Sequence, residues 1–391
     1  MTLINDKFSS PEVSINDSAV EESQMSQSQI DALPGNATNL RHDAMHAPHG
    51  PANDGHHHGV TSREAWDAAR AEMMTKGLDW PATIWLGVIH ISCLVAPFFF
   101  SWEGLIACLF LHWVTGGIGV CLGYHRLLTH TSFKCPNWVR YTLAVIGGLS
   151  GEGSALHWTA NHRKHHAHSD HEGDPHSPLD GPWWSHILWT AVARTDEDLK
   201  EFHDRWIPDL KDDKGLILIH KLFLPSHFAL GALLAGIGYW LGGRELAWSM
   251  VIWGMFVRLA FVLHSTWFVN SASHMWGYRN YDTTDESRNN WWVALLTYGE
   301  GWHNNHHAYP RMARHGHKWW EIDVTFITIS LMEKLGWATE VVDHQHKQKD
   351  DLNTIRKPAA AIDTAAILKA NYAELEKRRA SQPQGRETTE V

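Results

Sequence analysis

Nine histidines in four short groups are the residues of this chain best suited to bind metal ions. Two groups, at positions 162–166 and 303–307, have the pattern His-x-x-His-His, which places side chains at i, i+3 and i+4 on one face of a helix. A third group is His125-Arg-Leu-Leu-Thr-His130, and the fourth pairs Asn270 with His274. Neutral imidazole is the commonest metal ligand in proteins. Because one zinc ion needs only three or four ligands, nine histidines favour a centre with two ions.

The ligand type narrows the choice of metal. Imidazole suits zinc, copper, iron and nickel, and two irons with four or five nitrogen ligands each would account for nine histidines. Di-iron proteins of the carboxylate class need paired Glu-x-x-His motifs. Here only Glu300-Gly-Trp-His303 matches, and its histidine already belongs to a His-x-x-His-His group. Nitrogen-ligated iron can activate dioxygen, and such an oxidant can attack an unactivated alkyl chain. Zinc binds such sites more tightly than iron(II), so we expect overexpressed protein to carry zinc.

Four apolar segments predict the helices that position these groups. They cover residues 82–100, 104–123, 217–241 and 246–268, and each is long enough for one membrane span. Short polar or glycine-rich links at 101–103 and 242–245 join them into two hairpins. The shorter apolar stretch 139–149 predicts an interfacial or core helix. The predicted fold is therefore an all-α integral membrane protein with four transmembrane helices and a helical cytoplasmic cap that holds a histidine-rich di-iron site.

The topology predicts the side of the membrane on which the histidines lie. Two hairpins place the loop 124–215 and both terminal segments on the same side, together with all four histidine groups. The loop carries many lysines and arginines, whereas the hairpin turns contain a single cation, Arg244. The positive-inside rule then predicts that the metal site and both termini are cytoplasmic.

The composition divides the chain into three parts. Residues 1–78 are polar and predict a disordered arm, residues 79–343 form the membrane domain, and residues 344–391 form a charged, partly helical tail. The first residues contain no apolar segment behind a basic stretch, so no secretory signal peptide is expected. The formal net charge of −10 argues against a nucleic-acid partner.

Longer motifs around the histidines resemble those of a known family. They include Gly123-Tyr-His-Arg, Gly173-Asp-Pro-His176, Gly277-Tyr-Arg-Asn-Tyr281 and Gly299-Glu-Gly-Trp-His303. From about Trp80 to Val342 the chain resembles membrane fatty acid desaturases of the Δ9 acyl-lipid and stearoyl-CoA type. The resemblance implies insertion of a cis double bond, at Δ9, into a saturated acyl chain on a glycerolipid or on CoA. The family reaction uses dioxygen and two electrons.

The resemblance also implies roles for individual residues. Two irons would be held by nine histidines, and Asn270 would bind one iron through a water molecule. The nine ligands would be His125, His130, His162, His165, His166, His274, His303, His306 and His307. Asp174 and His176 would support the ligands or contact the substrate headgroup, with a structural turn as the alternative. Arg258, which lies within the last span, would have a structural or tunnel-lining role.

Two sequence differences from other members of this family bear on the acyl carrier and the electron donor. Animal acyl-CoA members have Arg-Asp just before the second histidine group, where they contact CoA. Here the residues are Ala160-Asn161, which favours an acyl-lipid substrate, although Arg163 and Lys164 could still contact phosphates. The chain contains no His-Pro-Gly-Gly motif of a fused cytochrome b5-like domain. A separate ferredoxin or cytochrome b5 would therefore supply the electrons.

Two other functions are alternatives. A hydroxylase on the same scaffold would transfer oxygen instead of removing a second hydrogen. A membrane metal-binding or transport protein would need ionisable residues that form a path through the spans. His90, His112, His227, Arg258 and His264 are scattered along the spans without a carboxylate partner, which argues against transport.

Overall fold

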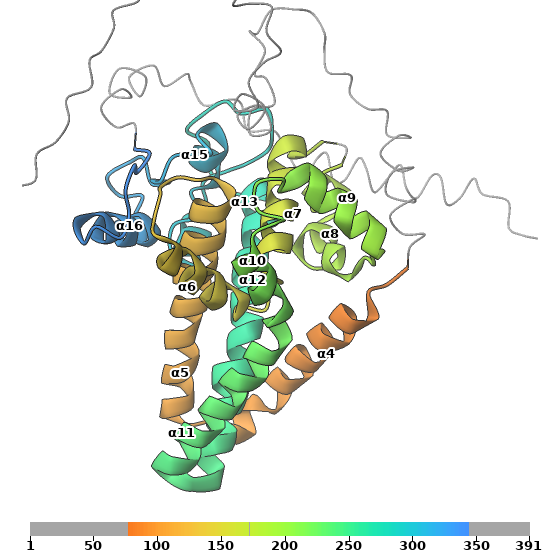
Figure 1. The fold of residues 1–391 in the computed structure, drawn as a ribbon, viewed down its shortest axis with the longest axis vertical. Coiled ribbons are helices and arrows are strands. Elements are labelled where there is room, and N and C mark those ends of the chain that lie inside the picture. Colours follow the sequence, from red (N-terminus) through yellow and green to blue (C-terminus); the bar gives the residue numbers. More distant parts are fainter. Residues whose placement is uncertain (1–76, 172, 344–391) are drawn as a thin grey trace, which may run out of the picture. The chain divides into compact units, whose positions relative to one another are not determined.

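The computed structural model describes residues 77–171 and 173–343, which fold into helices joined by loops and a few isolated β-bridges. Three helical runs are long and apolar enough to cross a membrane: Trp80–Phe99, Trp102–Thr129 and Phe223–Met275. Figure 1 shows these runs extending from one side of a group of shorter helices. The segments predicted to form the N-terminal arm and the C-terminal tail lie outside the described residues, apart from residues 77 and 78.

Side-chain caps start both helices of the first pair. The side chain of Asp79 accepts a hydrogen bond from the Ala82 amide at 2.9 Å, and the hydroxyl of Ser101 accepts one from the Gly104 amide at 3.0 Å. The break predicted at residues 101–103 therefore lies where the second helix of this pair starts, with Ser101 as its N-cap. The elements are α4 (Trp80–Val95), η1 (Ala96–Phe99), α5 (Trp102–His112) and the π-helix η2 (Trp113–Thr129).

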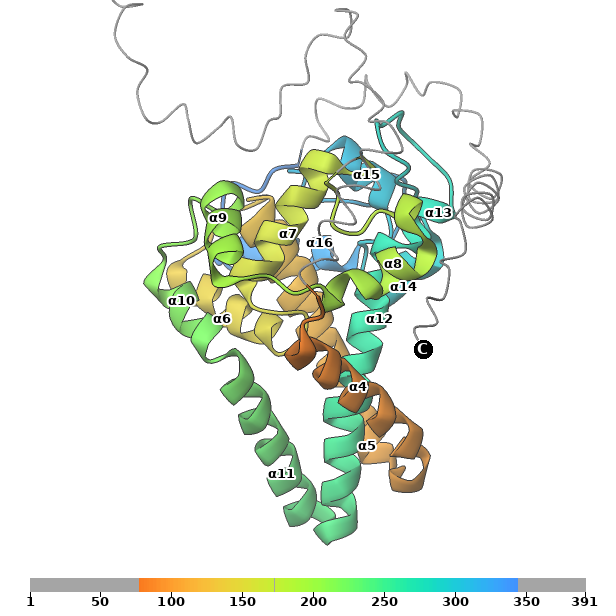
Figure 2. The same ribbon diagram turned by 90° about the vertical axis from the view of Figure 1, so that its right-hand side faces the viewer.

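The third run folds back on itself within α11 (Phe223–Val251). The backbone leaves the helical region at Gly242 and Gly243, and Gly243 has a positive φ of 75° that suits glycine. Gly238 lies so close to Ala247 that a Cβ on this glycine would stand 2.7 Å from the Ala247 Cα. Figure 2 shows the two limbs meeting at the end farthest from the shorter helices. The run continues through η5 (Ile252–Val257), α12 (Arg258–Asn270) and α13 (Ala272–Met275).

The start of α11 differs from the span expected at 217–241. Asp213 accepts hydrogen bonds from the Gly215 and Leu216 amides and so begins a separate helix, α10 (Lys214–Lys221). The backbone leaves the helical region at Leu222, and α11 starts one residue later. An apolar pattern alone could not separate these helices, because α10 and the start of α11 are both apolar and both contain leucine.

The shorter helices, together with the loops between them, form the part of the molecule that we call the cap. The short apolar helix predicted at 139–149 is present as α6. The cap helices are α6 (Asn137–Gly148), α7 (Ala155–His168), η3 (Pro178–Asp180), α8 (Pro182–His186), η4 (Leu188–Ala191), α9 (Asp196–Trp206), α10, α14 (Trp291–Leu296), α15 (His303–Ala308) and α16 (Val324–Lys334).

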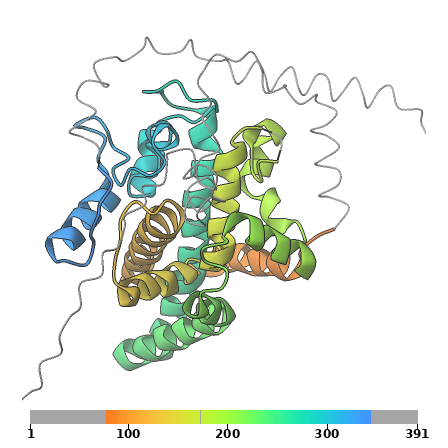
Figure 3. The ribbon, with the colours of Figure 1, turned by 45° about the horizontal axis from the view of Figure 1, so that its top comes forward.

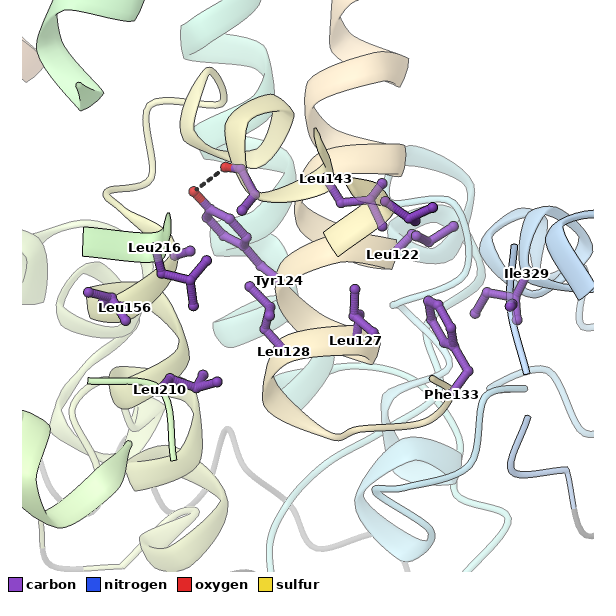
Figure 4. Close-up of a cluster of buried hydrophobic side chains, with 14 of the residues drawn as sticks. Leu122, Tyr124, Leu127, Leu128, Phe133, Leu143, Leu156, Leu210, Leu216 and Ile329 are labelled. Atoms are coloured by element: carbon purple, nitrogen blue, oxygen red, sulfur yellow. Dashed lines mark hydrogen bonds between the residues drawn. The ribbon is translucent and has the colours of Figure 1, made fainter. Parts of the chain in front are cut away.

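The largest buried apolar cluster joins η2 to the cap. Leu122, Leu127 and Leu128 of η2 lie among Leu143 of α6 and Ile329 of α16 (Figure 4). The close approach of α6 depends on a glycine of η2, because a Cβ at Gly119 would lie 2.6 Å from the Gly147 Cα. This packing holds the end of η2, and with it the first histidine group, against the cap.

Candidate metal centre

The nine predicted histidines form two buried clusters. Within each cluster the candidate ligand nitrogens all lie within 4.8 Å of one another. The Nε2 atom of His306 is 3.1 Å from Nε2 of His125 and 2.9 Å from Nε2 of His166. Two ligands that each lie 2.0–2.1 Å from one ion are themselves about 2.8–3.4 Å apart for angles of 90–109° at the ion, so this spacing suits a shared metal. The first cluster contains His125, His130, His162, His166 and His306, and the second contains His165, His274, His303 and His307.

A π-helix explains the His-x-x-x-x-His spacing of the first group. The turns of η2 close with i to i+5 hydrogen bonds, and the same bond continues at its end, where the His130 amide donates to the His125 carbonyl at 3.1 Å. In an α-helix, residues five apart would point about 140° away from each other. In this conformation both imidazoles enter one cluster, with their ring centroids 4.8 Å apart.

Each His-x-x-His-His group contributes ligands to both clusters. The i and i+4 histidines of each helix share one cluster, and the i+3 histidine enters the other. On α7 the pair is His162 and His166, which belong to the first cluster. On α15 the pair is His303 and His307, which belong to the second cluster. The two candidate sites therefore lie side by side between α7 and α15.

Carboxylates contact the second ring nitrogen of four of the histidines. Such a partner keeps the proton on Nδ1 and leaves Nε2 available for a metal ion. Of the four carboxylates, the sequence analysis proposed Asp174 alone. The Nδ1–oxygen pairs are His125–Glu300 at 2.7 Å, His165–Asp174 at 3.0 Å, His274–Asp170 at 2.7 Å and His307–Asp285 at 2.5 Å.

Unsatisfied nitrogens and lowered pKa values fit a metal centre. Within the described part of the chain, the buried Nε2 atoms of His130, His165 and His307 have no hydrogen-bond partner, although buried polar groups are normally satisfied. Burial lowers the pKa of His130 and His165 well below 6.5, so both are neutral at pH 7, the form that binds metal. Burial alone would raise the pKa of Asp170, but His274 lowers it to about 2.

A buried ion network supports the first cluster. Arg126, which is fully buried, donates hydrogen bonds to Glu300 at 3.0 and 3.1 Å and to Asp323 at 2.9 Å. The carboxylate of Glu300 also lies 2.9 Å from Nδ1 of His315. Because removal of one partner would leave an unpaired buried charge, these groups stabilise one another.

The sequence analysis missed this network, although signals were present. Arg126 follows a ligand directly within an otherwise apolar segment, and Glu300 precedes a ligand by three residues. Arg126 and Glu300 both lie within the motifs that carry the family resemblance, but no contact between them was predicted. Asp170 and Asp285 gave no comparable signal, because both lie in loops and are far along the sequence from the histidines that they contact.

The remaining predicted residues lie in different surroundings. Asp174 contacts a ligand of the second cluster, and the ring centroid of His176 is 4.3 Å from that of His165. Asn270 is the last residue of α12, four positions before His274. Arg258 is buried in α12, where it donates hydrogen bonds to the carbonyls of Gly254 and Leu149. Arg258 therefore joins α12 to the end of α6.

Asn161 is buried on α7, on the side where that helix approaches Arg194. Its side-chain oxygen accepts a hydrogen bond from Nη2 of Arg194 at 2.9 Å. Both residues lie near a pocket of about 340 Å³ whose lining includes Lys164, Trp189 and Arg194.

Three histidines outside the two clusters also come together. His90 of α4 and His264 of α12, scattered in the sequence, face each other with their Nε2 atoms 3.0 Å apart. His186 of α8 extends the row, with its Nε2 atom 2.9 Å from Nδ1 of His264. The hydrogen-bond and ion-pair contacts of the described residues add no carboxylate to this row, so it ties three helices together and gives no support to an ion path.

Two buried histidine clusters beside helices long enough to cross a membrane fit a membrane protein with a metal centre. The sequence pattern described as fatty acid desaturase matches residues 100–320. An sn-2 palmitoyl-lipid 9-desaturase of Nostoc sp. (strain 36) is 47% identical over 266 residues, which cover 68% of this chain and 90% of that relative. An sn-1 stearoyl-lipid 9-desaturase of Anabaena variabilis is 44% identical over 274 residues, which cover 69% and 96%. An acyl-CoA 5-desaturase of Anemone leveillei is 41% identical over 269 residues, which cover 68% and 81%.

The chain belongs to the membrane fatty acid desaturase family, and the resemblance of its motifs is confirmed. It is an integral membrane protein and an oxidoreductase.

Proposed function

We propose that this protein is an acyl-lipid desaturase that introduces a cis double bond at Δ9 into saturated acyl chains carried on a glycerolipid. It uses dioxygen and two electrons at a centre of two irons. The observation that carries this proposal is the pair of adjacent clusters with five and four histidines, which matches two ions better than one. The similarity to two lipid 9-desaturases supports the position of the double bond and the lipid carrier.

The nine histidines of the two clusters are the proposed metal ligands, and Asn270 is the proposed partner through a water molecule. When bound, the irons would supply the oxidant that removes two hydrogens from the acyl chain. The chain's own residues hold the ligands for this chemistry. Asp170, Asp174 and Asp285 fix the second cluster through Nδ1, and Glu300 does the same for His125.

A buried polar contact lies next to the first cluster and forms part of the wall beside it. The Trp158 ring stacks on the ligand His162, with centroids 4.9 Å apart. Glu152 accepts hydrogen bonds from Nε1 of Trp158 at 2.8 Å and from the Thr266 hydroxyl at 2.5 Å. These bonds join α12 to α7 and hold the indole against the metal ligand.

The pocket beside α7 is the proposed site for the polar end of the lipid. Lys164 and Arg194 on its wall offer cationic donors for phosphate or ester oxygens, and Trp189 offers an aromatic surface. The wall also carries the carboxylates of Asp79 and Asp198. Asn161 orients Arg194 through the hydrogen bond at 2.9 Å. Ala160, in place of the arginine that animal acyl-CoA members have at this position, removes a phosphate partner and so favours the glycerolipid as carrier.

The membrane arrangement completes the proposal. Because the third helical run bends back at Gly242 and Gly243, we propose four spans in two hairpins, with residues 79–343 as the desaturase domain. The cap and both termini face the cytoplasm, where a ferredoxin or cytochrome b5 delivers electrons.

Lipid analysis after expression in a host that lacks unsaturated acyl chains tests the function. The wild-type chain should produce a cis-Δ9 alkene in glycerolipids. His165→Ala should abolish the product, whereas His171→Ala, on an exposed position outside both clusters, should not. Undiminished product from His165→Ala would reject the ligand assignment, and a hydroxylated acyl chain would point to the alternative reaction. Elemental analysis of overexpressed protein is expected to find zinc, and full iron loading would contradict that expectation.

A further inference from the structure

The cap helix α16 carries an outward apolar stripe. Its members are Val324, Ile327, Leu331 and Leu335, of which the last three are 54–61% exposed. At 3.6 residues per turn, these four positions fall within a sector of about 80° around the helix axis. Exposed apolar side chains are ordinary when single, but a continuous stripe calls for a partner.

The other two faces of α16 differ from this stripe. Ile329 and Met332 are buried against the rest of the cap and lie about 120° around the helix from the stripe. On the third face, Glu333 and Lys334 are exposed and polar. A helix at the surface of a soluble domain needs only a buried face and a polar face. The additional apolar face is typical of a helix that lies in the boundary of a membrane, between protein, lipid and water.

The segments at both ends of α16 add aromatic and apolar surface. Trp319 is 95% exposed in the loop before the helix, and Ile322 is exposed in the same loop. After the helix, the ring of Trp337 meets the ring of Trp138 of α6 edge to face, with centroids 5.4 Å apart and both rings half exposed. Tryptophan concentrates at the membrane–water interface, where its amphipathic ring fits.

This surface continues into the membrane-spanning helices. Figures 1 and 2 show α6 and α10 at the level where the long helices enter the cap and α16 somewhat farther from the membrane-spanning runs, and Figure 3 shows α16 beside η2 and α6. Exposed apolar residues follow this level around the molecule, from Trp138 of α6 to Leu218 and Leu222 at α10. They then reach Leu224 at the start of α11. Because α11 belongs to a membrane-spanning run, lipid is the partner that covers the whole surface.

We propose that α16, with Trp319 and Ile322 before it, is an interfacial anchor that lies in the boundary between lipid headgroups and acyl chains. The anchor is coupled to the metal centre through Asp323. One oxygen of this carboxylate caps α16 by accepting a hydrogen bond from the Phe326 amide at 2.8 Å, and the other accepts one from Arg126 at 2.9 Å. The position of α16 in the lipid therefore fixes the height of the first histidine cluster above the acyl chains.

Spin labels on α16 in the full-length protein test the anchor. In a background where the partly buried Cys93 and Cys135 are replaced by serine, one nitroxide is attached at Leu331→Cys and, in separate samples, at Glu333→Cys and Glu197→Cys. The proteins are reconstituted into phosphatidylcholine–phosphatidylglycerol nanodiscs, and power saturation measures collisions with dioxygen and with a water-soluble nickel chelate. We expect the label at position 331 to collide mainly with dioxygen, and those at 333 and 197 mainly with nickel.

Two results would overturn the proposal. Dominant nickel collisions at position 331 would place the stripe in water. Few collisions with either reagent would mean that protein covers the stripe, as a second copy of this chain would. The measurement needs neither bound metal nor catalysis, so its outcome is independent of the proposed desaturase activity.

Discussion

The buried carboxyl group of Glu152 makes the stability of this protein depend on pH. Both of its oxygens accept hydrogen bonds, one from Trp158 and one from Thr266. Burial nevertheless raises its pKa from 4.5 to about 7, because these two bonds only partly offset the loss of water. Glutamine has nearly the same shape and can accept a bond from Trp158 while its amide donates to the Thr266 hydroxyl. Glu152→Gln therefore removes the charge and retains the contacts.

The sign of the effect follows from the raised pKa. Below pH 4.5 the group is protonated in both the folded and the unfolded protein and contributes no pH dependence. As the pH rises from 4.5 to 7, the unfolded chain ionises and the folded chain does not, so the folded state loses stability. A shift from 4.5 to about 7 corresponds to about 3 kcal/mol, since one pKa unit is worth about 1.4 kcal/mol. Above pH 7 the full penalty is present.

Thermal unfolding in nanodiscs measures this penalty. Glu152→Gln should match the wild type at pH 4.5 and be more stable at pH 8, with a Tm higher by roughly 6–12 °C. The difference between the two proteins is the informative quantity, because other titrating groups cancel in it. Glu197→Gln, on an exposed position of α9, serves as the control and should show no such trend. A Tm difference that stays constant between pH 4.5 and pH 8, or that grows toward low pH, would refute the reasoning.

Three further predictions concern the metal centre and the packing around it. Asp170→Asn and Asp285→Asn should each weaken metal binding at the second cluster by about 10–100-fold, measured by competition with a chelator, because each removes the carboxylate that holds a ligand imidazole; unchanged affinity would contradict this role. Removal of the metal by a chelator should lower Tm, and re-addition should restore it, since the ions bind only the folded protein; a Tm that ignores the metal would argue against bound ions. Gly119→Val should cost at least about 1–3 kcal/mol of stability, because its side chain would collide with the backbone of Gly147; a Tm equal to that of the wild type would disprove this contact.

Local patterns were sufficient to predict where the long apolar runs are interrupted. The polar break at Ser101 and the glycine pair at 242–243 both interrupt apolar runs, and both mark real interruptions of helix. The boundary between α10 and α11 was missed, because composition is similar on both sides of Leu222 and one backbone conformation decides the turn. The π-helix of η2 was also not predicted, since its apolar pattern does not distinguish i to i+5 from i to i+4 hydrogen bonds.

The candidate ligands were predictable because their spacing in the sequence is short. The division into two clusters was not, because it depends on how α7 and α15 face each other. The carboxylates that contact the ligands also differ in how predictable they were. Asp174 lies nine residues from its partner His165, whereas Asp170 is separated from His274 by 104 residues. Contacts between residues so far apart in the sequence arise from the tertiary fold, which a single sequence does not display.

Charge balance gives a reason for two ions that is independent of the number of histidines. Four buried carboxylates contact ligand imidazoles, and a fifth, Asp323, contacts Arg126. If metal ions occupy the Nε2 atoms, the ligand imidazoles are neutral, and Arg126 balances one of these five negative charges and leaves four. Unbalanced charges in a buried site are costly. Two divalent ions would carry four positive charges and balance these four carboxylates, whereas a single ion would leave two of them uncompensated.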